Sequence, residues 1–345
     1  MQPLDVRDFG AEGDGESDDS AAFQRALEAA AESRGTVFVP DGVFRCADVK
    51  VPPQTGLVGN PTWRYTEPGG SILRLSNEKA ACLLNLTGAI GCTINGLCLD
   101  GGKLGEGVHG ILVDKPDYIT EDAFRIERCW VARFTGDGVH LGRIWCFSIR
   151  HSMVAFNRGN GLWLKGWDGF VLDNWFSGNR QAGFGAFEEN ASITMVGNRI
   201  EWNQLGGIVL HAGGHYNISS NYIDRSGGPG IDLHDRCRQM TIVGNVIYRS
   251  GKPWRELSKH DSSHARLEGG EGIVFSGNMM TMGRDDGGKG DWSPRCAMVY
   301  GGLTNSVIAS NVMHNAALEE LMIDLGGHGE GVVVRDNVGS LGSPR

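Results

Sequence analysis

The stretch Ser192–Ile200, SITMVGNRI, recurs with small changes along most of the chain. The next copy, Tyr216–Ile223, reads YNISSNYI, and each copy is followed by a glycine-led apolar run such as Gly206–Leu210, GGIVL. Where no insertion intervenes, the copies return about every 22–24 residues, a period typical of stacked-repeat proteins. Each copy holds short β-rich runs separated by Gly and Asn, which predicts one coil of a single-stranded parallel β-helix.

The central asparagine of each copy is predicted to be structural, because stacked amides at one turn can bond from coil to coil. The asparagines predicted to be structural are Asn174, Asn198, Asn221, Asn245, Asn278 and Asn311. A further copy centres on Asn337, and Ser152 and Cys129 stand in the same place earlier.

Composition supports one long all-β domain and excludes some partners. The chain has 345 residues, 53 of them Gly, and a net charge of −9 without a block of Lys or Arg, so nucleic acid is not an expected partner. No apolar run is long enough to cross a membrane. The start, Met1–Asp5, lacks a secretory signal, so we expect a cytoplasmic protein or a secreted one that begins at its mature terminus.

The first sixty residues differ from the repeats. Asp18 and Asp19 are predicted to cap a helix that runs to about Ser33. Its apolar stripe consists of Phe23, Ala26, Leu27 and Ala30. We expect residues 1–60 to form a cap and the first coil, and residues 61–345 to form the remaining coils, with insertions near 251–263 and 283–295.

This opening resembles that of a known superfamily. Asp5–Gly15 (DVRDFGAEGDG), the Asp18–Asp19 pair, Gly35–Gly42 (GTVFVPDG) and Gly56–Gly59 (GLVG) are similar to the start of the pectate lyase superfamily. The similar group includes rhamnogalacturonase-type hydrolases, mannuronan C-5 epimerases and phage-tail depolymerases. The resemblance implies a right-handed β-helix that acts on sugar polymers. Because such relatives are often trimers, it also raises the expectation of a homotrimer.

Within each copy, the strand after the glycines alternates apolar and variable residues, so the variable ones are expected to face solvent. Stacking the copies then gives two outward columns. The first contains His140, Trp163, Gly185, Val209, Asp232, Arg266 and Met298. The second contains Gly142, Lys165, Phe187 (or Glu188), His211, His234, Glu268 and Tyr300.

The columns predict a catalytic group of Asp232, His234, Arg266 and Glu268, with Asp232 beside Arg266 and His234 between His211 and Glu268. Both insertions enter next to this group, and loops on a rigid scaffold often carry function. Expected substrate-binding residues are His211, Trp163, Lys165, Trp254, Trp292, Tyr300, Glu188 and His264. No metal ligand and no definite cofactor are assigned, and a need for a divalent cation such as calcium stays open.

The segment Gly228–Asp235, GPGIDLHD, is similar to the catalytic strand motif of mannuronan C-5 epimerases. By position, Asp232 and His234 match the catalytic Asp and His of that family, and Glu268 takes the place of a second Asp. Pro229 stands where the family has Tyr, so a phenol at the sugar has to come from elsewhere, such as Tyr300.

Three functions fit these residues. A lyase or epimerase acting on uronate sugars would use His234 as base, Arg266 or Lys165 to neutralise the sugar carboxylate, and Tyr300 or His211 as proton donor. A glycoside hydrolase or transglycosidase would use Asp232 and Glu268, whose backbones are expected roughly 8 Å apart. A non-catalytic adhesin or tail-fibre module would use the same strands only to bind a poly- or oligosaccharide.

Overall fold

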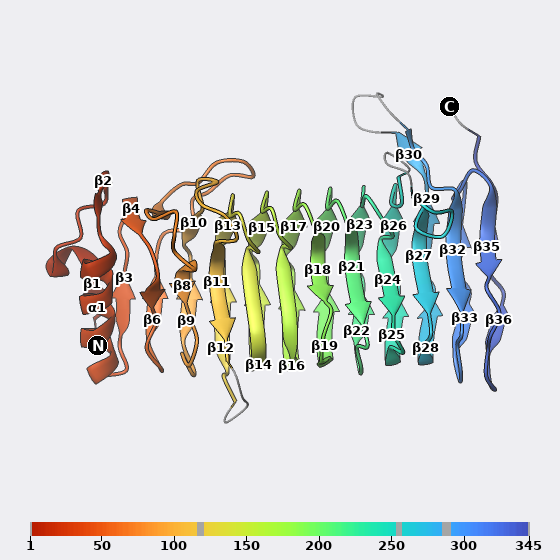
Figure 1. Ribbon diagram of the computed structural model, residues 1–345, viewed down its shortest axis with the longest axis horizontal. Coiled ribbons are helices and arrows are strands. Elements are labelled where there is room, and N and C mark those ends of the chain that lie inside the picture. Colours follow the sequence, from red (N-terminus) through yellow and green to blue (C-terminus); the bar gives the residue numbers. More distant parts are fainter. Residues whose placement is uncertain (1, 116–120, 253–256, 285–290, 344–345) are drawn as a thin grey trace. The chain divides into compact units, whose positions relative to one another are not determined.

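The computed structural model describes residues 2–115, 121–252, 257–284 and 291–343, which form two compact units, Met1–Trp175 and Phe176–Arg345. In both units, parallel strands follow one another as the coils of a β-helix (Figure 1). The mostly β fold with one short α-helix near the N-terminus confirms the predicted fold class. That residues 1–345 make one domain stays a prediction. No helix in the described part of the chain has the length and apolarity needed to cross a membrane.

Unit 1 contains the 3₁₀-helix η1 (Val6–Phe9), the helix α1 (Ser20–Glu32) and the early coils. Its strands are β1 (Leu4–Asp5), β2 (Asp14–Asp18), β3 (Thr36–Phe38), β4 (Gly42–Cys46), β5 (Val49–Lys50), β6 (Gly56–Val58), β7 (Ser71–Leu75), β8 (Cys82–Asn85), β9 (Thr93–Asn95), β10 (Cys98–Asp100), β11 (His109–Asp114), β12 (Phe124–Glu127), β13 (Trp130–Ala132), β14 (Val139–Arg150), β15 (Met153–Ala155) and β16 (Leu162–Leu172), and β17 (Trp175–Ser177) begins at its last residue.

Unit 2 contains the later coils and a short antiparallel pair of strands. Its strands are β18 (Ala182–Ala186), β19 (Asn190–Val196), β20 (Arg199–Glu201), β21 (Gly206–His211), β22 (Asn217–Ser219), β23 (Tyr222–Asp224), β24 (Ile231–His234), β25 (Arg238–Val243), β26 (Val246–Tyr248), β27 (Ser263–Glu268), β28 (Glu271–Ser276), β29 (Met279–Thr281), β30 (Gly283–Arg284), β31 (Asp291–Trp292), β32 (Cys296–Gly301), β33 (Val307–Ala309), β34 (Val312–Met313), β35 (Glu320–Asp324), β36 (Val333–Arg335) and β37 (Val338–Gly339).

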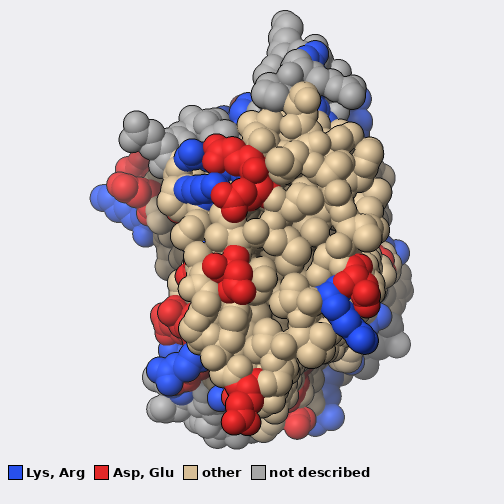
Figure 2. All heavy atoms as spheres, turned by 90° about the vertical axis from the view of Figure 1, so that its right-hand side faces the viewer, with Lys and Arg blue, Asp and Glu red and all other residues tan. Residues whose placement is uncertain are grey.

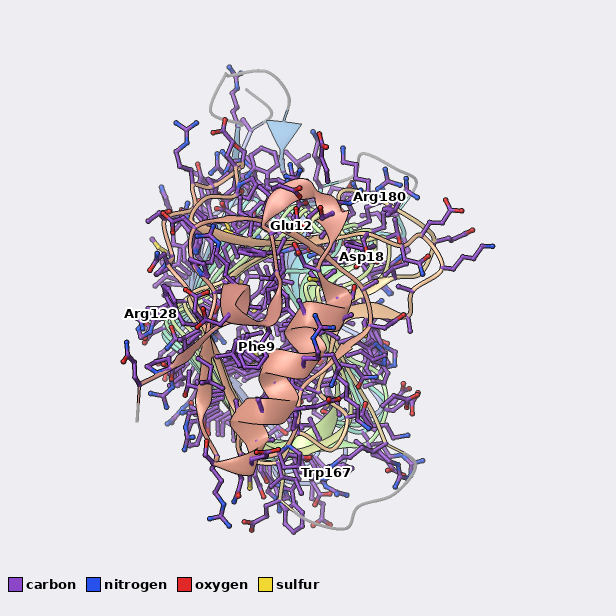
Figure 3. The ribbon with its side chains drawn as sticks, turned by 90° about the vertical axis from the view of Figure 1, so that its left-hand side faces the viewer. Phe9, Glu12, Asp18, Arg128, Trp167 and Arg180 are labelled. Atoms are coloured by element: carbon purple, nitrogen blue, oxygen red, sulfur yellow. The ribbon has the colours of Figure 1, made fainter. Side chains whose placement is uncertain are left out.

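Helix α1 covers the first coil of unit 1, as its apolar stripe predicts. Phe23 and Leu27 are fully buried, and the ring of Phe23 meets that of Phe44 edge to face at 5.5 Å. Figure 3 looks onto this end, where α1 lies in front of the strands with Asp18 at its start. Asp18 accepts a hydrogen bond from the Ser20 N–H at 3.0 Å. Asp19 instead accepts from the Glu12 N–H at 2.7 Å, so it holds the preceding loop rather than the helix.

A ladder of asparagine side chains confirms that the repeated Asn is structural. In unit 2, Asn221 donates from Nδ2 to the Asn245 side-chain oxygen at 3.0 Å, and its backbone N–H donates to the same oxygen at 3.0 Å. The same pair of bonds joins each member to the next through Asn198, Asn221, Asn245, Asn278, Asn311 and Asn337. Because each rung fixes one coil against the next, the strands stay in register along the unit.

The two insertions are described only in part. Residues 257–262 of the first lead into β27, and β30 and β31 of the second pair antiparallel. Trp254 lies outside the described residues. Trp292 is the last residue of β31, and its side chain is outside the described part of the structure.

Candidate functional site

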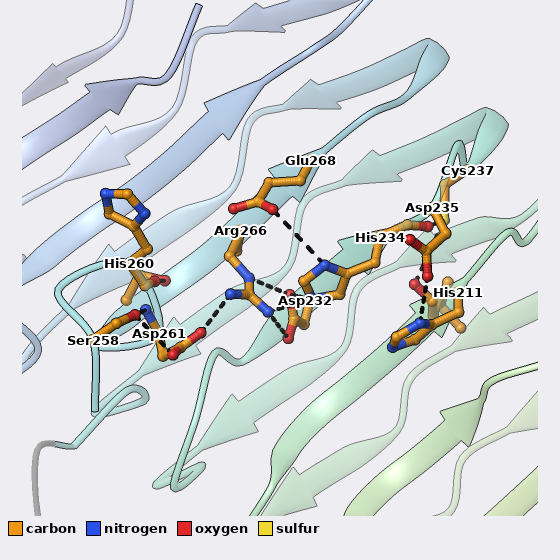
Figure 4. Close-up of polar contacts among 12 residues, drawn as sticks. His211, Asp232, His234, Asp235, Cys237, Ser258, His260, Asp261, Arg266 and Glu268 are labelled. Atoms are coloured by element: carbon orange, nitrogen blue, oxygen red, sulfur yellow. Dashed lines mark hydrogen bonds and ion pairs between the residues drawn. The ribbon is translucent and has the colours of Figure 1, made fainter. Parts of the chain in front are cut away.

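Two adjacent parallel strands, β24 and β27, position the predicted catalytic residues. The pairing aligns Asp232 with Arg266 and Leu233 with Leu267. Because side chains alternate along a strand, Leu233 and Leu267 pack inward, while Asp232 and Arg266 share the other face. The preceding strand, β21, continues this face, since His211 pairs with His234. The structure thus confirms the predicted neighbours (Figure 4).

Asp232 and Arg266 form a two-pronged ion pair that is largely shielded from solvent. Arg266 Nε lies 2.8 Å from Asp232 Oδ1, and Nη2 lies 3.1 Å from Oδ2. The two side chains are only 9% and 15% exposed. Burial favours the neutral form of Asp232, but hydrogen bonds from His234 and Arg266 outweigh it and lower the pKa of the carboxyl. Asp232 is therefore held ionised.

The first insertion adds a second carboxylate to Arg266. Asp261, three residues before His264 in the loop that enters β27, bonds Nη1 of Arg266. Its own position is fixed by Ser258, whose hydroxyl donates to Asp261 Oδ2 at 2.7 Å. Burial opposes the charge of Arg266, but the bonds and charges of its acidic neighbours, Asp232 first, raise its pKa. With Glu268 nearby, the group has more acidic than basic charge.

His234 lies at the centre of the group. Its Nε2 is 2.8 Å from Asp232 Oδ1 and also contacts Nη2 of Arg266, so this nitrogen is held by the ion pair. Its Nδ1 faces Glu268, with 4.0 Å between Nδ1 and Oε2. The His234 side chain is 17% exposed and that of Glu268 is 36% exposed. The Glu268 side of the imidazole is therefore the one open to a ligand.

A second imidazole adjoins the first. The rings of His211 and His234 have centroids 5.0 Å apart, and His211 Nδ1 bonds Asp235 Oδ2 at 2.7 Å. Asp235 was not selected from the sequence because it lies just after the strand. The alternation of side chains along a strand does not predict which way its side chain points. Its backbone has a φ of +57°, a left-handed turn that lies just after β24. The contact of Asp261 with Arg266 was not predicted for the same kind of reason, since Asp261 lies on a loop.

The predicted register fails at β32. Arg266 pairs with Val299, Leu267 with Tyr300 and Glu268 with Gly301, so Met298 and Tyr300 are each displaced by one residue from their predicted partners. The second insertion hides where β32 begins, and a slip of one residue exchanges the two faces of a strand. Tyr300 is accordingly 7% exposed, and its ring stacks on His328 at 5.7 Å. It does not lie beside Glu268.

The structure also places two further residues that the sequence analysis singled out, His264 and the outward residue at 187 or 188. His264 is fully buried, with Nε2 bonded to the carbonyl oxygen of Ala316 at 2.9 Å, so it faces the interior rather than a substrate. Burial lowers the pKa of His264 to about 4. Of the alternatives Phe187 and Glu188, Phe187 is the one next to His211, with ring centroids 5.4 Å apart, while Glu188 is exposed.

Trp163 and Lys165 belong to unit 1, where the predicted columns also hold. His140 pairs with Trp163 and Gly142 with Lys165. The rings of His140 and Trp163 are parallel and stacked at 4.2 Å.

A group that the sequence analysis did not assign lies beside them. His109, Asp137 and His140 bring three potential metal-ligand atoms within 4.8 Å of one another, a group to which the sequence analysis gives no role. The signal in the sequence is the repeated Val-His pair, Val108–His109 and Val139–His140. Burial lowers the pKa of His109. Burial opposes the charge of Asp137, but hydrogen bonds, chiefly from His140, outweigh it and lower its pKa.

Surface hollows occur elsewhere on both units. One is lined by Phe124, Phe147 and Phe170 among others, and another by Met282, Arg284 and neighbouring residues. Neither includes the Asp232–Glu268 group.

Comparisons with known proteins agree with the fold. Residues 4–75 match the family described as rhamnogalacturonase A/epimerase, pectate lyase-like, and residues 137–282 match the right-handed beta helix region. The mannuronan C5-epimerase AlgE3 of Azotobacter vinelandii is 50% identical over 50 residues, which are 14% of this chain and 3% of that protein. The chain thus matches only a small part of that relative's length.

Among solved structures, the A-module of the A. vinelandii mannuronan C-5 epimerase AlgE6 superposes with a TM-score of 0.66 at 18% identity, covering 99% of this chain and 100% of that one. DFA-IIIase of Arthrobacter chlorophenolicus A6, without its lid, gives 0.68 at 14% identity, covering 99% of both chains. At such identities the likeness establishes the fold alone. The chain therefore has a right-handed β-helix fold, and its residues 4–75 match the family described as rhamnogalacturonase A/epimerase, pectate lyase-like.

Proposed function

We propose that this protein acts on a uronate-containing polysaccharide and removes the proton next to the sugar carboxylate, as a lyase or an epimerase does. The observation that carries the proposal is His234, an imidazole fixed by Asp232 and Arg266 on one side and open beside Glu268 on the other. The sequence match to a mannuronan C5-epimerase supports the choice of a uronate.

In this proposal His234 Nδ1 is the base. Its other nitrogen is held by the ion pair, which fixes the ring, and a positioned base contributes typically about 10²–10⁴-fold to a rate. Glu268, 4.0 Å away, stabilises the imidazolium that forms when the proton is taken. His211, held by Asp235, is the proposed proton donor, since Tyr300 is buried away from Glu268.

Arg266 is the proposed partner of the sugar carboxylate. Asp261 already bonds its Nη1 and is 35% exposed, whereas Asp232 is 9% exposed on the other side. A carboxylate is the chemical group that an incoming uronate presents. We infer that the sugar carboxylate takes the place of Asp261 on Arg266, while Asp232 stays bonded.

The same geometry argues against Asp232 as the acid of a glycoside hydrolase. A glycoside hydrolase needs one carboxyl group in its protonated form near neutral pH, with a raised pKa. Asp232 is ion-paired to Arg266 and its pKa is lowered, so it lacks the proton that this role requires.

The test is a panel of polymannuronate, polyguluronate, polygalacturonate and dextran, incubated with the full chain. Ultraviolet absorbance reports unsaturated lyase products, proton NMR reports epimerisation, and a reducing-end assay reports hydrolysis. We expect unsaturated ends or inverted sugars from at least one polyuronate and nothing from dextran. His234→Gln should lower turnover by about 100-fold or more.

The matched control is His314→Gln, which changes an exposed histidine of the same unit that lies outside the group. It should keep the activity of the unchanged protein. Saturated products with new reducing ends would point to a hydrolase, and binding without turnover would point to a binding module. Either result, or full activity in His234→Gln, would show that the proposal is wrong.

A further inference from the structure

A second cluster of titratable side chains lies in unit 1 and shares no residue with the group used above. It is built by β11 and β14, in which Ile111 pairs with Val139. His109 and Asp137 each precede that pair by two residues, so the parallel register brings them side by side. His140 follows Val139, and its ring lies over that of His109 with centroids 4.6 Å apart.

The spacing of the donor atoms fits a small metal ion. Asp137 Oδ2 lies 2.8 Å from His140 Nδ1 and 3.6 Å from His109 Nδ1. An ion with metal–ligand bonds of about 2.0–2.1 Å in tetrahedral geometry holds its ligand atoms roughly 3.3 Å apart. The two distances fall on either side of this value, and all three ligand atoms lie within 4.8 Å of one another.

Surrounding groups hold these ligands in place. Asp137 Oδ1 accepts hydrogen bonds from the backbone N–H of Asn160 at 2.6 Å and from its Nδ2 at 2.9 Å, which leaves Oδ2 facing the imidazoles. Trp163 stacks flat on His140 and limits the rotation of its ring. The Asp137 side chain is 10% exposed, and the two histidines are 23% and 22% exposed. Metal ligands in proteins are commonly oriented by such outer partners.

We propose that His109, Asp137 and His140 bind a divalent transition-metal ion, with zinc as the preferred occupant. Two imidazole nitrogens and one carboxylate oxygen are the donors that zinc takes in sites with three protein ligands, where a fourth position stays open to water or another oxygen ligand. Calcium prefers six to eight oxygen ligands, so the two nitrogens select against it. The binding exchanges two hydrogen bonds for bonds to the metal: the one between His140 Nδ1 and Asp137 Oδ2, and the one that His109 Nδ1 accepts from the Asp137 backbone N–H at 3.1 Å.

The test is isothermal titration of the full chain, stripped of metal with EDTA, using Zn²⁺, Co²⁺ and Ca²⁺ separately. We expect one Zn²⁺ per chain, a visible absorption spectrum on adding Co²⁺, and no displacement of Zn²⁺ by an equal concentration of Ca²⁺. His140→Ala and His109→Ala should each raise the Kd for Zn²⁺ by at least about 100-fold, since even a partner of a ligand is worth about 10- to 100-fold. Asn160→Ala should raise it by about 10- to 100-fold through the loosened carboxylate.

The matched control is His151→Ala. His151 also faces a carboxylate, with Nε2 3.7 Å from Asp173 Oδ2, but both side chains are about 60% exposed and no third ligand joins them in the described residues. This variant should bind Zn²⁺ as the unchanged protein does. Absence of Zn²⁺ binding, an unchanged Kd in His140→Ala, or preference for Ca²⁺ would each overturn the proposal. Circular dichroism checks folding, and His140→Gln replaces any alanine variant that fails to fold.

Discussion

Arg266 shows how many contacts one side chain can make on a strand of the β-helix. It bonds Asp232 with two nitrogens, Asp261 with a third, and touches His234. Removing either member of the shielded Asp232–Arg266 pair leaves an uncompensated charge, which typically destabilises a protein by about 3–5 kcal/mol when the pair is buried. Substitutions of these two residues therefore mix loss of folding with loss of chemistry. His234, which lies beside the pair, is the cleaner residue for testing catalysis.

We expect His264, two residues before Arg266, to make the stability of the protein depend on pH. Burial holds its pKa at about 4 in the folded chain, below the ordinary value of 6.5. Between pH 4 and pH 6.5 the imidazole is protonated in the unfolded chain but neutral in the folded chain. The contribution of His264 to the free energy of unfolding is therefore complete above pH 6.5 and is lost as the pH falls towards 4. The difference between the two pKa values corresponds to a loss of about 3 kcal/mol in the free energy of unfolding. Urea unfolding at pH 7, 5.5 and 4 measures it.

His264→Gln is the variant that isolates this effect. Its amide can still donate to the Ala316 carbonyl, but it does not titrate. We expect the variant to lose less stability than the unchanged protein between pH 7 and 4, by about 3 kcal/mol, and the exposed His314→Gln to behave like the unchanged protein. Equal slopes for all three proteins would mean that His264 is not the titrating group.

At the scale of the elements, the features that repeat were predictable from the sequence. The asparagine ladder, the stripe of α1 and the pairing of Asp232 with Arg266 all depend on a regular period, which the sequence displays directly. Asp235 and Asp261 lie on turns and loops, where no period fixes the direction of a side chain. Tyr300 was misplaced because an insertion conceals the first residue of its strand.

The first insertion carries a prediction of its own through Asp261. If this carboxylate occupies the place of the sugar carboxylate on Arg266, then Asp261→Asn should lower KM for a polyuronate. The amide keeps the size and the Ser258 contact but loses the charge. The Asp261 side of this ion pair reaches solvent, and ion pairs at the surface are worth about 0.2–1 kcal/mol, so KM should fall by up to about fivefold. Initial rates over a range of polyuronate concentrations give the value.

Asp336→Asn serves as the control for Asp261→Asn. It removes the same charge from an exposed pair, Arg335–Asp336, with 3.5 Å between the charged atoms and no contact with Arg266. Its KM should stay close to that of the unchanged protein. A KM that rises in Asp261→Asn, or one that falls equally in both variants, would show that Asp261 does not stand in for the substrate.

The charge of the whole molecule sets a final expectation. The chain carries 41 acidic and 32 basic residues, a net charge of −9. Figure 2, which faces the side where β35 and β36 lie in Figure 1, shows acidic and basic groups scattered over a mostly uncharged surface. A polyuronate is itself an anion. The net negative charge of the protein therefore repels an approaching polyuronate, even though Arg266 supplies a positive charge locally.

Salt should consequently improve the use of a polyuronate. Raising the ionic strength from about 0.01 M to 0.15 M shortens the screening length from about 30 Å to about 8 Å, which weakens the long-range repulsion more than the shielded contacts at Arg266. We expect KM to fall several-fold over this range, and the Kd of any neutral glycan that binds to stay constant. Steady-state rates at four salt concentrations measure the trend. A KM that climbs steadily with salt would mean that attraction by local positive charge governs binding, and the argument from net charge would fail.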